Sequence, residues 1–131
     1  MIDRRLMLKG FFVAASFAVS PSAFAFEAQT FDAKAFEAAQ MAGKPVLIEV
    51  TAPWCPTCKA QKPILSNLGK DPKFKDMVVF QIDFDTQKDL LRKFDVRMQS
   101  TLISYKGTKE VGRSTGDTNA ASIEALLVQS I

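Results

Sequence analysis

Residues 46–59 read Val-Leu-Ile-Glu-Val-Thr-Ala-Pro-Trp-Cys-Pro-Thr-Cys-Lys and contain both cysteines of the 131-residue chain. The run from residue 45 to residue 50 is rich in branched apolar side chains, which predicts a buried strand interrupted by one acid, Glu49. Residues 58–69 have a helical pattern with a kink at Pro63 and end at a glycine. The two cysteines therefore lie at a turn from a strand into a helix.

This position favours redox chemistry for Cys55 and Cys58. Unpaired backbone N–H groups and the dipole at a helix N-terminus stabilise negative charge, so we expect the pKa of Cys55 to lie below the usual thiol value of about 8.5. The Cys55 thiolate would attack a partner disulfide, and Cys58, one turn further in, would resolve the mixed disulfide. The alternative is a permanent bridge, but a four-residue loop would contribute only roughly 2 kcal/mol of stability.

The composition narrows the remaining chemistry. The chain has no histidine, which removes Ser-His-Asp and Cys-His catalysis. Two cysteines alone fall short of the three or four ligands of a zinc site, so we expect no metal within one chain and no cofactor. Of the 17 basic and 14 acidic residues, three basic and one acidic precede residue 10, which leaves a nearly balanced remainder. No nucleic-acid partner is implied.

The first 25 residues have the pattern of a signal peptide. A short basic region leads into an uncharged stretch from Gly10 to Phe26, whose apolar part, residues 11–19, is shorter than the ~20 residues that cross a bilayer. Ala23 and Ala25 provide the small residues that a signal peptidase reads. We therefore expect cleavage after Ala25 and a single domain over residues 26–131.

The pair Arg4-Arg5, followed by apolar residues and Lys9, resembles a twin-arginine signal, although Asp3 and Met7 depart from the usual residues of that motif. A general secretory signal and a retained membrane anchor are the alternatives. All three place the domain outside the cytoplasm, in a bacterial periplasm or its equivalent, where disulfides form.

The rest of the chain alternates between helical and strand patterns. Residues 26–30 are expected to be a linker. Such alternation, closed by a hairpin and a last helix, predicts an α/β fold with a three-layer α/β/α sandwich around a mixed sheet. The predicted elements are a helix over 30–41, with Thr30 or Asp32 as its cap and Gly43 as its stop, a strand over 77–83, a helix over 87–94, strands over 101–105 and 109–113 joined by a turn, and a helix over 119–128.

Two side chains near the cysteines each have two interpretations. Glu49 lies in a strand that is otherwise apolar, where its pKa would be raised and it could take a proton from Cys58 through water. Alternatively, the strand is less buried and Glu49 pairs with a lysine. Trp54 is either a partly exposed wall of the site or a simple packing residue.

Residues 46–59, together with Pro63, resemble the active-site segment of the thioredoxin family, and the similarity extends over residues 30–131. The resemblance implies a thioredoxin fold with Cys55 as nucleophile and Cys58 as resolving thiol. It also places Glu49 at the buried acid and Gly116 before the last helix. The residues that it implies in contact with protein substrates are Trp54, Pro56, Thr57, Gln99, Ser100 and Thr101.

The chain departs from this family at two places. Ser100 aligns with the family's cis-proline, and because a non-proline cis bond costs about 3 kcal/mol, we expect a trans bond, a reshaped loop and a hydroxyl that could reach a cysteine sulfur. Pro56-Thr57 separates the cysteines without the histidine that stabilises the thiolate in strong oxidants of the family. We therefore expect a reductant or exchanger of protein disulfides.

The layout of residues 44–96 is similar to the periplasmic C-terminal domain of thiol:disulfide interchange membrane proteins. A reductant outside the cytoplasm needs such an electron donor, so the resemblance implies a membrane partner besides the protein substrates. The alternatives are a periplasmic oxidase and a non-catalytic, chaperone-like binding module. We expect the protein to be a monomer.

Overall fold

The computed structural model of the chain describes residues 15–16 and 26–131. Apart from residues 15–16, the predicted signal peptide lies outside this part. The described elements are β1 (Gln29–Thr30), α1 (Ala33–Met41), β2 (Pro45–Thr51), α2 (Pro56–Leu68), a 3-10 helix (Pro72–Phe74), β3 (Val78–Asp83), α3 (Lys88–Lys93), β4 (Thr101–Lys106), β5 (Lys109–Thr115) and α4 (Ala120–Val128).

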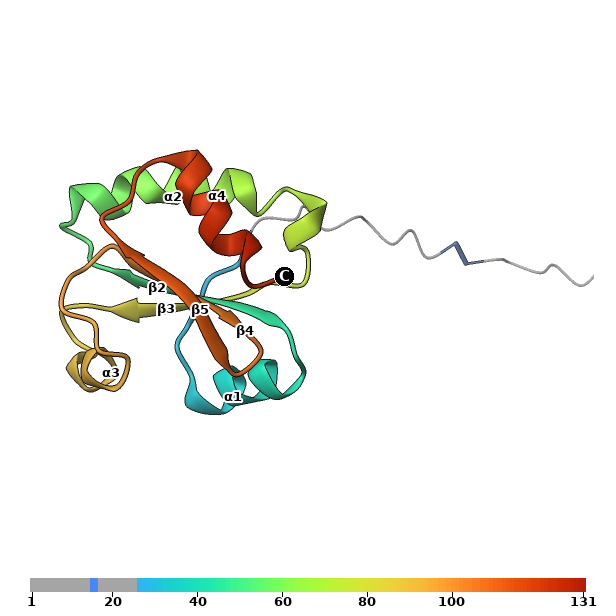
Figure 1. Ribbon diagram of the computed structural model, residues 1–131, viewed down its shortest axis with the longest axis horizontal. Helices are drawn as coiled ribbons and strands as arrows, with labels where there is room; N and C mark the ends of the chain where they lie inside the picture. Colours follow the sequence, from blue (N-terminus) through green and yellow to red (C-terminus); the bar gives the residue numbers. More distant parts are fainter. Residues whose placement is uncertain (1–14, 17–25) are drawn as a thin grey trace, which may run out of the picture.

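The strands form one mixed sheet in the order β1-β3-β2-β4-β5. β3 runs parallel to β1 and β2, whereas β4 is antiparallel to both β2 and β5. Figure 1 shows α2 and α4 together on one face of the sheet and α1 and α3 on the other. The predicted three-layer α/β sandwich is thus confirmed, and the predicted elements match to within a few residues at their ends.

The expected linker over residues 26–30 is the main error of the sequence-based prediction. Gln29 and Thr30 form β1, which pairs with Phe80 and Gln81 of β3. The ring of Phe26 lies 6.2 Å from that of Phe74. Two residues are too few to show the alternation that marks a strand in a sequence. β1 is recognised only from its pairing with β3 in the structure.

The first helix confirms Asp32, one of its two predicted caps, and begins after Phe31, which was expected on the helical face. Its N-cap is Asp32, whose carboxylate accepts the backbone N–H of Ala35 at 2.9 Å. Phe31 therefore precedes the helix, although its ring still packs on that of Phe36, 5.4 Å away between centroids. Gly43, the predicted stop, has a φ of +71°, a left-handed conformation in which glycine is favoured.

Alternation along β2 separates two cores and determines where Glu49 lies. Val46, Ile48 and Val50 belong to the aromatic core beneath α1 and α3. Leu47 belongs to the core under α2 and α4. Because successive side chains of a strand point to opposite faces, Glu49 lies on the same side as Leu47, under α2.

Candidate active site

Cys55 is the N-cap of α2, and its sulfur accepts the backbone N–H of Cys58 at 3.1 Å. Pro56 occupies the first turn, where its fixed φ suits a helix and its missing N–H leaves no donor unsatisfied. The cysteines are 0% and 1% exposed and pack with Ala52 and Phe84. Both thiols are free. Attack on a partner therefore requires the groups that cover Cys55 to move.

The two thiols have opposite electrostatic environments. Burial raises the pKa of Cys55, but hydrogen bonds from the Cys58 side chain, from the backbone N–H groups of Cys58 and Thr57, and from the Gln99 side chain outweigh it, so the pKa is lowered. Burial and the hydrogen bond to Cys55 raise the pKa of Cys58. The pair therefore favours a thiolate on Cys55 and a thiol on Cys58, as the helix position predicts.

The segment that faces the cysteines contains Ser100 in an unusual conformation. The Gln99–Ser100 bond is trans, as predicted, and Ser100 has a φ of +59°. Its backbone N–H donates to the carbonyl of Val50 at 2.8 Å, which ties the segment to the end of β2.

The expectation that the Ser100 hydroxyl reaches a cysteine sulfur is wrong. A hydroxyl has one proton, and that of Ser100 donates to the Gln99 carbonyl at 2.5 Å. The residue of this segment that lowers the pKa of the Cys55 thiol is instead Gln99, through its side chain.

The residues that the resemblance implies in substrate contact differ in their exposure. Trp54 and Pro56 are exposed, whereas Thr57 and Gln99 are half-buried. Ser100 and Thr101 are buried, and the Thr101 hydroxyl donates to the Met98 carbonyl at 2.8 Å. The side chains available to a substrate at the surface are therefore those of Trp54, Pro56, Thr57 and Gln99.

Two large apolar side chains near the site residues in the chain are exposed: Trp54, next to Cys55, at 55%, and Met98, next to Gln99, at 52%. The indole N–H of Trp54 donates to the Asp85 carboxylate at 2.9 Å, which fixes the ring. Neither Met98 nor Asp85 was predicted as a site residue; Asp85 lies 31 residues from Trp54, and no local pattern joins the two.

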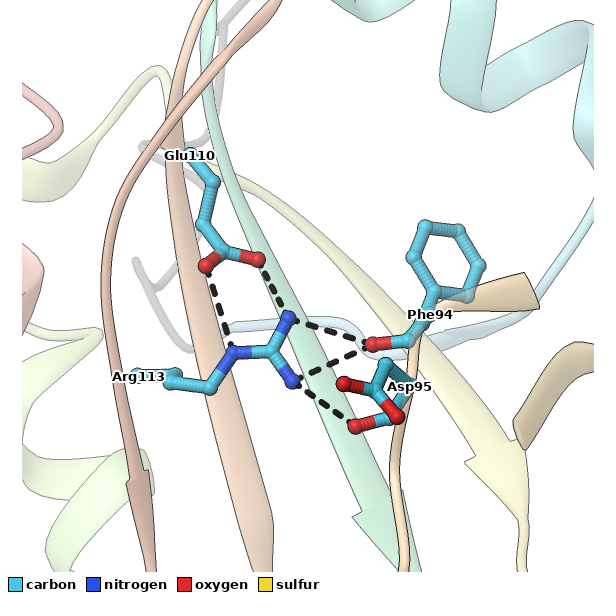
Figure 2. A network of polar contacts seen from close by, with 4 residues as sticks. All are labelled: Phe94, Asp95, Glu110 and Arg113. Atoms are coloured by element: carbon cyan, nitrogen blue, oxygen red, sulfur yellow. Dashed lines mark hydrogen bonds and ion pairs between the residues drawn. The ribbon is translucent and has the colours of Figure 1, made fainter. Parts of the chain in front are cut away.

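The segment from α3 to β4 is held at its beginning by Arg113 of β5 (Figure 2). The Arg113 guanidinium donates to the carbonyls of Phe94 and Asp95, each at 3.1 Å. It is itself oriented by the Glu110 carboxylate, at 2.5 Å and 3.2 Å. Arg113 thus fixes the C-terminal end of α3, from which the chain runs toward Ser100.

Glu49 is 6% exposed and lines a pocket of about 190 Å³ under α2 together with Lys62 and Gln81. A second pocket, of about 220 Å³, is lined by Cys58 and also by Lys62 and Gln81. Burial raises the pKa of Glu49, and the charge of Lys62 lowers it by a smaller amount. Burial and a nearby lysine, the two alternatives considered for Glu49, are therefore present together.

Within the part of the chain that the structure describes, no three of the histidine, cysteine, aspartate and glutamate side chains lie close enough to hold a metal ion. In the same part, no helix has the length and apolar character needed to span a membrane.

Comparison with known proteins agrees with the geometry of the dithiol. The sequence model of the family described as Thioredoxin matches residues 27–129. Thioredoxin Asp f 29 of Aspergillus fumigatus is 31% identical over 97 residues, which are 73% of this chain and 87% of that protein. Thioredoxin-2 of Saccharomyces cerevisiae is 34% identical over 83 residues, 63% of this chain and 78% of that one.

Among solved structures, Trxlp from Edwardsiella tarda EIB202 superposes with a TM-score of 0.72 and 44% identity, covering 75% of this chain and 95% of that one. The family match spans nearly all of residues 26–131, and the pair of cysteines has the spacing of the family's dithiol. The chain therefore belongs to the thioredoxin family and is a thiol-disulfide oxidoreductase.

Proposed function

We propose that this protein is an exported reductant or exchanger of protein disulfides that works through Cys55 and Cys58. The Cys55 thiolate attacks one sulfur of a substrate disulfide, which forms a mixed disulfide and releases the other substrate sulfur as a thiolate. Cys58 then loses its proton and attacks Cys55, which releases the second substrate sulfur and leaves a Cys55–Cys58 disulfide. Two electrons pass from the protein to the substrate.

Glu49 is the proposed acceptor of the Cys58 proton in the second step. Its support is the pair of pockets that share Lys62 and Gln81, one lined by Glu49 and the other by Cys58. A water in this region would carry the proton. Glu49→Gln should slow the resolution of the mixed disulfide by about 100-fold, the lower end of general-base effects, whereas Cys55 alkylation should keep its rate. Equal rates of resolution in both proteins would contradict this role.

The direction of electron flow is supported by the groups around Cys55. Burial, the largest single influence, raises the pKa of Cys55, and hydrogen bonds from neutral groups together outweigh it. Strong oxidants of this kind owe their potential to a greatly stabilised reduced form. Neutral hydrogen bonds stabilise a thiolate less than a cation does, so a reductant or exchanger is favoured over an oxidase.

Redox equilibrium in glutathione or dithiothreitol buffers tests this direction, with fluorescence of the single tryptophan, Trp54, as the readout. A potential at or below about −250 mV would support a reductant, and one near about −120 mV would make the protein an oxidant. If Cys55→Ser and Cys58→Ser kept full activity toward a disulfide-containing protein, a binding module would replace the redox proposal.

Export is proposed from the sequence pattern of residues 1–25, with cleavage after Ala25. A domain that begins at Phe26 is supported by the packing of the Phe26 ring on Phe74. N-terminal sequencing of the protein from the periplasmic fraction of a producing cell tests the cleavage point. Replacement of Arg4 and Arg5 by lysine should block export through the twin-arginine route and leave general secretion unaffected.

A reductant in this compartment needs a supply of electrons, so we propose a membrane protein with an exposed dithiol as the donor. We also propose that the protein works as a monomer. Trp54, next to Cys55, and Met98, next to Gln99, are exposed apolar side chains that would provide the contact surface for this partner. Trapping with Cys58→Ser, which cannot resolve a mixed disulfide, should capture both substrates and donor. Recovery of cytoplasmic proteins alone would contradict the proposed location.

A further inference from the structure

Gln61 is a buried polar residue to which the reaction described above gives no role. It lies on α2, three residues after Cys58, and is 1% exposed. Its side-chain amide donates to the carbonyl of Ser100 at 3.1 Å and to that of Asp117 at 2.9 Å. One amide group thus joins the cysteine helix to two segments that are 39 and 56 residues away in the sequence.

The Ser100 carbonyl is a point where several segments meet. It also accepts the backbone N–H of Gly116 at 3.1 Å, while the N–H of Ser100 donates to Val50 at 2.8 Å. The φ of +59° at Ser100 is rare for a residue with a side chain. Such a conformation persists only where the surroundings constrain it, and Gln61 provides one of these constraints from the cysteine helix itself.

Gln99, the residue before Ser100, links this segment to the nucleophile. Its side chain lowers the pKa of the Cys55 thiol. Its carbonyl accepts the Ser100 hydroxyl at 2.5 Å. A displacement of Ser100 would therefore move Gln99 relative to Cys55. Gln61, through the Ser100 carbonyl, limits that displacement.

We propose that Gln61 is a positioning residue of the exchange reaction, which holds the Gln99–Ser100 segment against α2 and so keeps the Gln99 side chain beside the Cys55 thiol. The same contact serves reduction and oxidation, so the inference does not depend on export or on the direction of electron flow. It requires only that Cys55 reacts as a thiolate.

The test compares Gln61→Met, which keeps the length of the side chain and removes both donors, with Leu65→Met. Leu65 is buried on the same helix one turn further on, and its side chain has no donor for the Ser100 carbonyl, so its change perturbs packing and removes no hydrogen bond to this segment. The readouts are the ultraviolet titration of the Cys55 thiolate and the pH profile of kcat/KM for reduction of insulin disulfides.

In Gln61→Met the titration of Cys55 should move to higher pH. A rise of one pH unit in the titration point lowers the thiolate fraction tenfold at a pH below that point. The remaining thiolate is about threefold more nucleophilic, because nucleophilicity rises with the pKa. The net result is a fall in kcat/KM of about threefold. Leu65→Met should leave both readouts unchanged. A cooperatively folded Gln61→Met with the titration and pH profile of the wild type would overturn the proposal.

A second comparison tests the route through Gln99. In a Gln99→Ala background, Gln61→Met should add no further shift to the Cys55 titration, because the contact that it positions is already lost. Equal shifts in both backgrounds would overturn this route.

If Gln61→Met does not fold, nuclear magnetic resonance of the wild type tests the role of Gln61 instead. The Gln61 side-chain amide protons should exchange slowly and change their chemical shift as Cys55 titrates, and rapid exchange with no such change would overturn the proposal. A wild type that fails to reduce insulin while Gln61 meets both criteria would refute the proposed reductant alone.

Discussion

Replacement of Glu49 by glutamine should stabilise the protein at neutral and alkaline pH. Burial raises the pKa of Glu49 above its ordinary value of 4.5, and the charge of Lys62 lowers it by less. The folded state therefore binds this proton more tightly than the unfolded chain does. The resulting stability is complete below about pH 4.5 and is lost as the pH rises through the folded-state pKa. Above that pH, only the wild type has a buried carboxylate.

The size of the effect follows from the surroundings of Glu49. An uncompensated buried polar group costs about 1–3 kcal/mol, and the neighbouring Lys62 offsets part of that cost. We expect Glu49→Gln to raise the free energy of unfolding by about 1–2 kcal/mol at about pH 8 and to leave it unchanged at about pH 4.

Urea unfolding followed by Trp54 fluorescence, repeated from about pH 4 to about pH 9, measures this difference. Glu37→Gln is the control, because Glu37 is exposed on α1 and its change should shift stability by less than about 0.5 kcal/mol at every pH. A Glu49→Gln variant whose stability difference does not depend on pH, or which is less stable than the wild type at about pH 8, would refute the reasoning.

Three further substitutions test the packing and the surface. Phe80→Ala should destabilise the protein by about 3–5 kcal/mol in urea unfolding, because Phe80 is fully buried between aromatic rings, and a loss below about 1 kcal/mol would contradict that core. Asp85→Ala should release the Trp54 indole and lower its fluorescence anisotropy, whereas an unchanged anisotropy would mean that packing holds the ring. Gly116→Ala should cost about 1–2 kcal/mol from its φ of +73° alone, since nothing lies within 4 Å of an added methyl group, and a neutral effect would contradict that conformation.

Local pattern was enough to predict most of the sheet and helices. The apolar run of β2 ends directly at the cysteines, and a helix that starts there gives Cys55 the cap position and Cys58 the next turn. Period-two alternation also places Glu49 on the opposite face from Ile48 and Val50. These features depend on residues within a few positions of one another, which is the range over which sequence patterns operate.

The tertiary structure alone decided which groups surround the dithiol. Gln61 meets Ser100 across 39 residues, and Trp54 meets Asp85 across 31. The local secondary structure around each of these residues could equally have left its side chain in solvent, so sequence patterns do not predict these contacts. The sequence by itself determined where the two thiols lie in a strand-to-helix turn, because backbone geometry dictates that. Packing of a distant segment determined that the Gln99 side chain adds to the local hydrogen bonds from Cys58 and Thr57 that lower the pKa of Cys55.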